Sequence, residues 1–495
     1  MRNRVVGTET EFGIVTREAG SSDPVNQSIL LVGSCPVLPS PDILWDYENE
    51  NPLNDARGFE IEGEKERPGP EYNRLLNKLL FNGGRLYVDG AHPEYSSPEC
   101  LSPRELVAYE KAGERILDLC RETCDRISRK ENGTVLYKNN TDGKSNSYGY
   151  HENYLVERAV SFEAIARALI PFLITRQVYT GAGKVGGENR SEPVEYQISQ
   201  RADFFEALID LNTMVKRPIM NTRDEPHAES SKYRRLHVIV GDSNMSEVST
   251  FLKIGTMMLV LSAIEEGVDF GIAVENPVKV HKAVSRDLTL KKKYRLAGGG
   301  EMTALEIQKV YLEKTSAIFE NGKDSPPFAK EVLEKWKSVL SGLESDPDQL
   351  STELDWLIKR QMIASYISKK GYGWKDPKIF MLDLQYHDIS PEKSLYHHLE
   401  KDGFVKRMVT DNEISRAMES PPAGTRAYFR GNCLRKFPKE IYAASWTSVL
   451  FDVGEENVKR IPLMDPFRGT QELVEKIFES SHSVKDLLSN LVRSA

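Results

Sequence analysis

Alternating hydrophobic and polar positions predict a strand close to the N-terminus, and the same alternation brings two carboxylates together. From Val5 to Val15 the chain reads V-V-G-T-E-T-E-F-G-I-V. Successive side chains of a strand point to opposite faces, so Thr8 and Phe12 lie opposite Glu9 and Glu11. The two glutamates would be about 7 Å apart and would repel each other. A metal ion, a cluster of basic side chains and a solvated acidic edge are the three explanations that this pattern leaves open.

Similar patterns predict further strands and helices along the first 300 residues. Strand-like segments are expected at residues 84–90, 134–140, 194–200 and 235–242. Helical periodicity covers residues 106–127, 162–174 and 246–266, with Gly267 as a stop signal. Several strands are followed by Gly, Asp or Asn rather than by a crossover motif. This order favours an α+β fold with a largely antiparallel sheet.

The remainder of the chain divides into a helical part and a short mixed part. Residues 300–415 are charged and mostly helical in pattern, and Ser420 to Gly424 reads like a linker. We therefore expect a large domain at residues 1–420 and a small C-terminal domain at residues 421–495. A mobile loop is predicted at about residues 44–72, because Arg57 to Tyr72 is too polar and too rich in Gly and Pro to pack.

Composition narrows the classes of function. A chain of 495 residues is too long for one compact core, and a net charge of −8 disfavours a general nucleic-acid binder. The N-terminus has no signal-peptide core, and the apolar stretch from Met257 to Ile264 is too short to span a bilayer. We expect a cytoplasmic protein without a membrane partner. The five scattered cysteines indicate reduced thiols.

The segment from Gly84 to Glu99 carries the first candidate chemistry. In a strand, Arg85, Tyr87 and Asp89 share one face, and a turn at Gly90 precedes His92, Glu94 and Glu99. A regular row of polar side chains is not what a core needs. The pattern therefore favours a strand that offers ligands and a carboxylate to a cavity, with a solvated strand face as the alternative.

Two more segments add histidines to the same picture. His151 follows a Gly-rich turn, and Arg235 and His237 share one face of a strand. Several carboxylates and two histidines on one sheet are costly to bury unless divalent cations and phosphates neutralise them. Hard oxygen ligands favour Mg²⁺ or Mn²⁺ over zinc, and phosphate-bound magnesium implies ATP. Arg235 and Arg85 are the candidate phosphate contacts.

A glycine motif elsewhere does not support a nucleotide site of its own. Gly181 to Gly186 matches G-x-G-x-x-G, but the residues that follow do not predict a helix whose N-terminus could face a phosphate.

Long motifs, in order along nearly the whole chain, resemble a known family. They are G-T-E-T-E-F-G, N-G-G-R-L-Y-V-D-G-A-H-P-E-Y-S-S-P-E-C, Y-K-N-N-T-D-G-K, S-Y-G-Y-H-E-N-Y-L, N-T-R-D-E-P-H-A, K-Y-R-R-L-H-V-I-V-G-D-S-N and T-R-A-Y-F-R-G-N-C. Together they are similar to the depupylases (Pup deamidases) and the Pup ligases, sister enzymes in the glutamine synthetase-like superfamily of carboxylate-amine ligases. The resemblance implies an α+β fold with a curved, largely antiparallel sheet backed by helices, and a small C-terminal domain.

The resemblance also implies roles for individual residues. Those expected to bind magnesium are Glu9, Tyr87 and Glu94, with Glu11, His151 and His237 as further ligands. Those expected to contact ATP are Arg85, Ser97, Arg235, Arg426 and Trp446, the last two from the C-terminal domain. Asp89 would be the catalytic carboxylate.

One segment favours the depupylase among the two sisters. Trp45 to Phe59 resembles a loop that marks depupylases, and Asp142 to Lys144 and Ala427 to Arg435 are also depupylase-like, whereas Asp242 to Glu247 and Arg295 to Gly299 are closer to the ligases. The resemblance thus implies a hydrolase that deamidates the C-terminal glutamine of Pup, a small disordered modifier protein. The same enzyme would cleave the bond between Pup and substrate lysines, with ATP and Mg²⁺ bound. A Pup ligase and an inactive Pup-binding protein are the alternatives.

Overall fold

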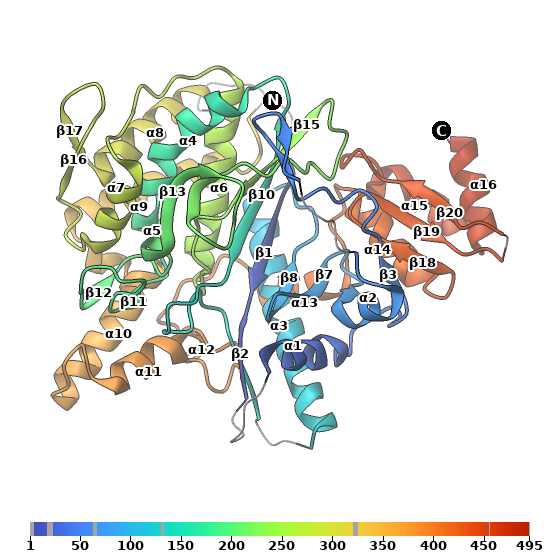
Figure 1. Ribbon diagram of the computed structural model, residues 1–495, viewed down its shortest axis with the longest axis horizontal. Coiled ribbons are helices and arrows are strands. Elements are labelled where there is room, and N and C mark those ends of the chain that lie inside the picture. The colour runs from blue at the N-terminus through green and yellow to red at the C-terminus, as the bar shows by residue number, and fades with distance from the viewer. Residues whose placement is uncertain are drawn as a thin grey trace.

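The computed structural model describes residues 4–16, 23–62, 67–129, 133–319, 325–454 and 456–494. Its centre is a six-stranded sheet in the order β15-β10-β1-β8-β7-β6, in which every pairing is antiparallel (Figure 1). The strands are β1 (Val6–Glu11), β6 (Asn77–Leu79), β7 (Arg85–Asp89), β8 (His92–Ser96), β10 (Tyr150–Glu157) and β15 (Tyr233–Val238). Together with the helices around it, this sheet confirms the predicted α+β class.

One face of the sheet is buried against long helices, and the other face is polar. Along β1, Val6, Thr8 and Thr10 are buried, whereas Glu9 and Glu11 are only partly covered. Helix α3 (Pro103–Ile127) contacts β1, and α6 (Glu247–Glu265) contacts β10. The predicted alternation is therefore confirmed, and the carboxylates lie on the open face.

The remaining elements surround this centre. The other helices are α1 (Pro24–Gly33), α2 (Pro70–Leu76), α4 (Phe162–Thr175), α5 (Gln177–Thr180), α7 (Pro277–Arg286), α8 (Ala304–Phe319), α9 (Ala329–Ser345), α10 (Asp355–Lys370), α11 (Pro377–Tyr386), α12 (Leu395–Lys401), α13 (Asp411–Glu419), α14 (Ala427–Lys436), α15 (Gln471–Ser480) and α16 (Val484–Ser494). The other strands are β2 (Gly13–Thr16), β3 (Leu44–Trp45), β4 (Asn54–Asp55), β5 (Phe59–Glu60), β9 (Thr134–Tyr137), β11 (Lys184–Val185), β12 (Tyr196–Gln197), β13 (Phe205–Asp210), β14 (Arg217–Asn221), β16 (Lys293–Arg295), β17 (Glu301–Thr303), β18 (Ile441–Ala444), β19 (Ser448–Phe451) and β20 (Lys459–Pro462). The predicted helical region at residues 300–415 is confirmed by α8 to α13.

Two predicted strands differ in detail. The first one breaks at Phe12, whose backbone N–H donates to the carbonyl of Pro93, and continues as β2, which pairs with β9 instead. The segment at residues 194–200 keeps only β12, because the N–H of Ile198 donates to Ser285 in α7 rather than to a neighbouring strand. Local alternation cannot anticipate either of these distant partners.

Helix α6 is the one helix among the described residues that is long and apolar enough to cross a membrane. All of its apolar window is buried inside the fold, as in the core helix of a globular domain. The helix continues beyond the apolar stretch from Met257 to Ile264 and is longer than that stretch suggests. The five cysteines are free thiols and are buried, as the sequence predicted.

A second sheet combines one strand from the N-terminal part of the chain with three strands from the C-terminal part. It has the order β20-β19-β18-β3, and β3 pairs in parallel with β18 through Leu44 and Trp45. Figure 1 shows the blue β3 beside the orange-red C-terminal strands. The predicted loop at residues 44–72 thus begins with a buried strand, in which Trp45 is 2% exposed, whereas Phe59 and Ile61 are exposed. The loop's mobility and the domain boundary at residue 420 stay predictions.

Candidate functional site

The register of the central sheet places the candidate residues in one row. Glu9 on β1 lies opposite His151 on β10 and opposite Ser96 on β8. Glu11 lies opposite Glu94, which in turn lies opposite Tyr87 on β7. Because side chains of directly paired residues point to the same face, these residues from four strands share the open face of the sheet.

Glu9, His151 and His237 form the first cluster. A ligand atom of each lies within 4.8 Å of the others. The Nδ1 atom of His151 is 3.1 Å from Glu9 Oε2, and Nη1 of Arg235 is 3.4 Å from Glu9 Oε1. Burial alone would raise the pKa of Glu9, but the hydrogen bond with His151 and the positive charge of Arg235 hold that pKa well below its usual range. Glu9 is therefore ionised.

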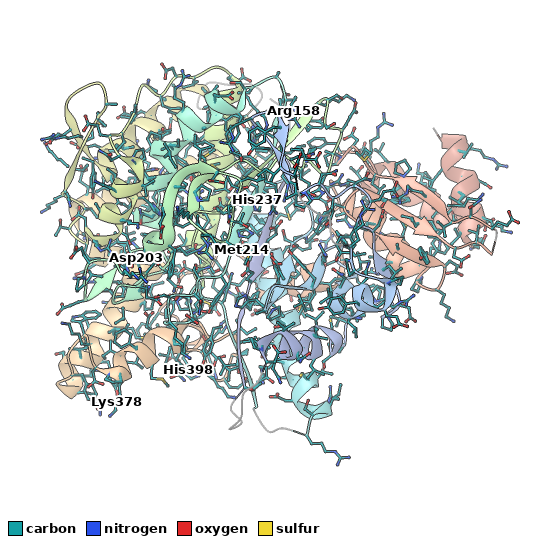
Figure 2. The ribbon with its side chains drawn as sticks, viewed as in Figure 1. Arg158, Asp203, Met214, His237, Lys378 and His398 are labelled. Atoms are coloured by element: carbon teal, nitrogen blue, oxygen red, sulfur yellow. The ribbon has the colours of Figure 1, made fainter. Side chains whose placement is uncertain are left out.

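The same cluster contains an unused imidazole nitrogen. His237 is 1% exposed, and its Nε2 atom is buried without a hydrogen-bond partner among the described residues. Burial and then the nearby Arg235 hold the pKa of His237 well below its usual range, so the ring is neutral. Figure 2 marks His237 near the centre of the molecule. A buried neutral imidazole with a free lone pair is suited to bind a metal ion.

Glu11, Asp89 and Glu94 form a second cluster, also with ligand atoms within 4.8 Å of one another. Burial, followed by the charges of Asp89 and Glu11, raises the pKa of Glu94 well above its usual range. Burial and then Glu11 raise the pKa of Asp89, although its side chain reaches solvent at the end of β7. For Glu11, burial is outweighed by the hydrogen bond with His92, whose Nδ1 atom is 3.3 Å from Oε2, and its pKa is lowered.

These two clusters fit divalent cations. The Oε2 atom of Glu94 is buried and has no hydrogen-bond partner among the described residues, so this oxygen is available to bind a cation. A Cβ atom on Gly149 would lie 2.5 Å from His151 Nε2 and 2.7 Å from Glu11 Oε1, so the missing side chain keeps space open between the clusters. Carboxylate oxygens in such number are the ligands that magnesium prefers.

A cavity with about 550 Å³ of empty space, part of it continuous with solvent, lies beside Glu9. Four of the five predicted nucleotide contacts line it, namely Ser97, Arg235, Arg426 and Trp446. Ser97 Oγ accepts a hydrogen bond from the N–H of Thr8 at 2.9 Å, which ties the wall to β1. The cavity thus brings the central sheet and the C-terminal segment together next to the first cluster.

Arg85 is placed differently from the other predicted nucleotide contacts. It does not line this cavity, and its guanidinium lies between the rings of Trp45 and Tyr87, 3.9 Å from each ring centroid. Its Nε atom also donates to Asn77 Oδ1 at 3.0 Å. The ring of Trp45, which belongs to β3, thus covers the guanidinium. The role of Arg85 as an ATP contact stays a prediction.

The sequence reasoning missed several residues of the site. Asn153, two positions after His151, shares its strand face and contacts three members of the site, and the alternation along β10 could have revealed it. Glu99 was named in the candidate segment, but its ion pairs with Arg426 and Arg430 were not predicted. His227 lines the cavity from a loop with no periodic signal.

Comparison with known proteins shows the family of this chain. A family model described as "Pup-ligase protein" matches residues 4–450. The chain belongs to this family. Among its curated relatives, a depupylase of Acidothermus cellulolyticus is 45% identical over 99% of both chains. A Pup deamidase/depupylase of Mycolicibacterium smegmatis is 43% identical over 99% of both chains. A Pup–protein ligase of Nakamurella multipartita is 41% identical over 97% of this chain and 100% of its own.

Solved structures of family members share the fold. The structure of Pup with its ligase PafA has a TM-score of 0.80 and 34% identity, over 99% of this chain and 95% of that one. The structure of PafA with ADP has a TM-score of 0.75 and 37% identity, over 85% of this chain and 95% of that one. The family resemblance and the fold that it implied are therefore confirmed.

Proposed function

We propose that this enzyme is a hydrolase that deamidates the C-terminal glutamine of Pup and cleaves the isopeptide bond between Pup and substrate lysines. The observation that carries the proposal is the identity of up to 45% to a depupylase, which extends over 99% of both chains. The segment from Trp45 to Phe59, which resembles the depupylase loop, agrees with it. Pup and pupylated proteins would be the partners, as the names of the relatives indicate.

ATP and Mg²⁺ are the proposed cofactors. Glu11, Glu94 and Tyr87 would hold one cation, and Glu9, His151 and His237 would hold a second position. When bound, magnesium neutralises the clustered carboxylates and polarises the oxygen atoms that it contacts. One of the two PafA structures is a complex with ADP, which supports a nucleotide in the cavity.

The cavity offers each part of a nucleotide a suitable partner. Trp446 presents an aromatic face for a base, and Arg235 presents a cation beside Glu9 for phosphates. Arg426 lines the same wall, but its Nε atom donates to Glu99 Oε1 at 2.7 Å and its Nη1 atom donates to the carbonyl of Leu463 at 2.7 Å. We infer that Arg426 shapes the cavity and contributes charge with its remaining nitrogen.

Asp89 is the proposed catalytic carboxylate. It is the exposed member of its cluster, so a substrate can reach it, while Glu94 behind it is buried. Amide hydrolysis needs a nucleophile or a base, and the carboxylate form of Asp89 can attack the side-chain carbonyl carbon or take a proton from water. Hydrolysis needs no phosphoryl activation, so ATP would act chiefly as a bound cofactor.

Replacement of Asp89 tests this function. Asp89→Asn keeps the shape of the side chain but removes the reactive charge, so release of ammonia from glutamine-ending Pup and of the unmodified protein from its Pup conjugate should be lost. Binding of ATP and Pup should persist in calorimetry. The matched control is Asp402→Asn, which changes an exposed carboxylate far from these clusters in sequence. More than a few per cent of wild-type turnover in the Asp89 variant would remove Asp89 from the mechanism.

A Pup ligase is the second candidate, because both solved relatives described above are ligases. In that reaction ATP would phosphorylate the glutamate of Pup, and Asp89 would deprotonate the incoming lysine. The two reactions differ in their use of ATP. ADP that forms in step with a new Pup–protein bond would identify a ligase, whereas product release without stoichiometric ADP would identify the hydrolase.

A further inference from the structure

Asn153 connects three charged or metal-binding candidates on the open face of the sheet. Its Nδ2 atom donates to Glu9 Oε1 at 3.0 Å. Its Oδ1 atom accepts from Arg235 Nη1 at 2.8 Å and lies 3.0 Å from Nδ1 of His237. The register explains this arrangement, because Asn153 lies directly opposite His237 in the pairing of β10 with β15.

The partners of Asn153 fix the orientation of its amide group. A guanidinium can only donate and an ionised carboxylate can only accept hydrogen bonds. A flipped amide would direct its NH₂ group at Arg235 and its oxygen at Glu9, so both contacts would be repulsive. Oδ1 therefore faces Arg235 and His237, and an oxygen in this position can only accept. The proton of the neutral His237 ring must then lie on Nδ1.

This arrangement leaves the lone pair of His237 on Nε2. That atom is buried and has no hydrogen-bond partner among the described residues, and a ligand atom of His237 lies within 4.8 Å of ligand atoms of Glu9 and His151. We propose that Asn153 is a positioning residue that holds His237 as the Nδ1–H tautomer, so that Nε2 offers its lone pair to a divalent cation between Glu9 and His151. This inference rests on the cation site of the proposed function.

The proposal separates the two tasks of Asn153, and two substitutions test them differently. Asn153→Leu has nearly the same shape but offers no acceptor, so no hydrogen bond from position 153 favours the proton on Nδ1 of His237. Asn153→Asp keeps an acceptor for His237 and Arg235, removes the donor to Glu9 and adds a negative charge. The tautomer should therefore change in the leucine variant and persist in the aspartate variant.

The tautomer can be read directly from the protein without nucleotide, Pup or metal. In protein labelled with ¹⁵N-histidine, the imidazole nitrogen shifts distinguish a protonated from an unprotonated nitrogen. The His237 signals, among those of nine histidines, are assigned by their absence in His237→Gln. We expect protonated Nδ1 in the wild type and in N153D, and a substantial Nε2–H population in N153L.

Binding of Mn²⁺ alone, followed by electron paramagnetic resonance of the free ion, gives the second readout. N153L should weaken one class of Mn²⁺ site by roughly 10- to 100-fold, as expected when the partner that orients a ligating histidine is removed. Thermal unfolding checks that the variant is folded.

Several outcomes would overturn the proposal. A His237 ring protonated on Nε2 and not on Nδ1, in the wild type or in N153D, would do so even if N153L failed to fold. A folded N153L with wild-type Mn²⁺ affinity would do so as well. Lack of Pup hydrolysis by the wild type would overturn the proposed function alone, since neither readout uses Pup.

Discussion

Glu99 joins the central sheet to the C-terminal part of the chain beside the cavity. Its Oε1 atom accepts from Nε of Arg426 at 2.7 Å, and Oε2 accepts from Nη2 of Arg430. All three side chains are nearly inaccessible to solvent. Arg430 also donates to the carbonyl of Gly83 at 2.8 Å, so these contacts hold α14 against the segment that leads into β7. Replacing Glu99 by glutamine should leave two buried guanidinium groups without their carboxylate.

The pKa of Glu99 gives the magnitude. Burial raises this pKa, but the charges of Arg430 and Arg426 outweigh burial and lower it from 4.5 to about 2. A difference of this size between the folded and unfolded chain corresponds to about 3 kcal/mol. Removal of one partner of a buried ion pair costs about 3–5 kcal/mol by independent precedent. We therefore expect Glu99→Gln to lower the free energy of unfolding by about 3 kcal/mol at pH 7.

The sign of the pH dependence follows from the lowered pKa. The stabilisation is fully present above the unfolded pKa of about 4.5 and is lost as the pH falls toward the folded value of about 2. The difference between wild type and variant should shrink to about 1 kcal/mol at pH 3, because a protonated Glu99 resembles glutamine.

Urea unfolding followed by tryptophan fluorescence measures both values, since Trp45 and Trp446 lie next to this interface. The matched control is Glu331→Gln, which breaks an exposed pair with Arg104 at 2.6 Å. That pair should be worth less than about 1 kcal/mol. Equal stability of the Glu99 variant and the wild type at pH 7, or a difference that does not change with pH, would refute the reasoning.

Two further substitutions test the metal clusters. Glu9→Ala should weaken Mg²⁺-dependent ATP binding by ~10-fold or more in calorimetry at limiting Mg²⁺, because it removes a proposed ligand of a hard cation. An unchanged affinity for ATP at limiting Mg²⁺ would show that Glu9 is a solvated strand residue and not a metal ligand. Gly149→Ala places a Cβ atom 2.5 Å from His151 Nε2 and 2.7 Å from Glu11 Oε1, so these side chains must move apart. Mn²⁺ binding should fall while the melting temperature stays close to that of the wild type, and wild-type affinity would show that the open space is not used.

Much of the fold could be predicted from local patterns. The helices α3, α4 and α6 were found from their sequence patterns. α3 and α4 each bury an apolar stripe whose spacing is visible in the sequence, whereas α6 is apolar and is buried on every side. Strands β1 and β7 were found from alternation. The strand β8 was not predicted, because Pro93 and the polar residues His92 and Glu94 interrupt its alternation. The strand forms through its pairing with β1 on one side and β7 on the other.

The candidate site was predictable as a set of residue types but not as a geometry. Strand alternation indicated that Glu9 and Glu11 face the same way, but it could not show that they belong to two clusters. That division depends on register, which pairs Glu9 with His151 and Glu11 with Glu94. Register results from hydrogen bonds between segments far apart in the chain, and the sequence carries no local signal for it.

The segment from Leu44 to Trp45 shows why the cavity cannot be assigned to one part of the chain. Trp45 completes the C-terminal sheet, and its ring also covers the guanidinium of Arg85, on the strand that ends in Asp89. The ring of Trp446 meets Trp45 edge to face at 5.2 Å and lines the cavity. Trp446 lies in the connection between β18 and β19. A nucleotide that binds against it therefore contacts a sheet whose strands come from the N-terminal and the C-terminal parts of the chain. Because a ligand that binds only the folded state stabilises it, occupancy of this cavity should stabilise the attachment of β3 to β18 as well.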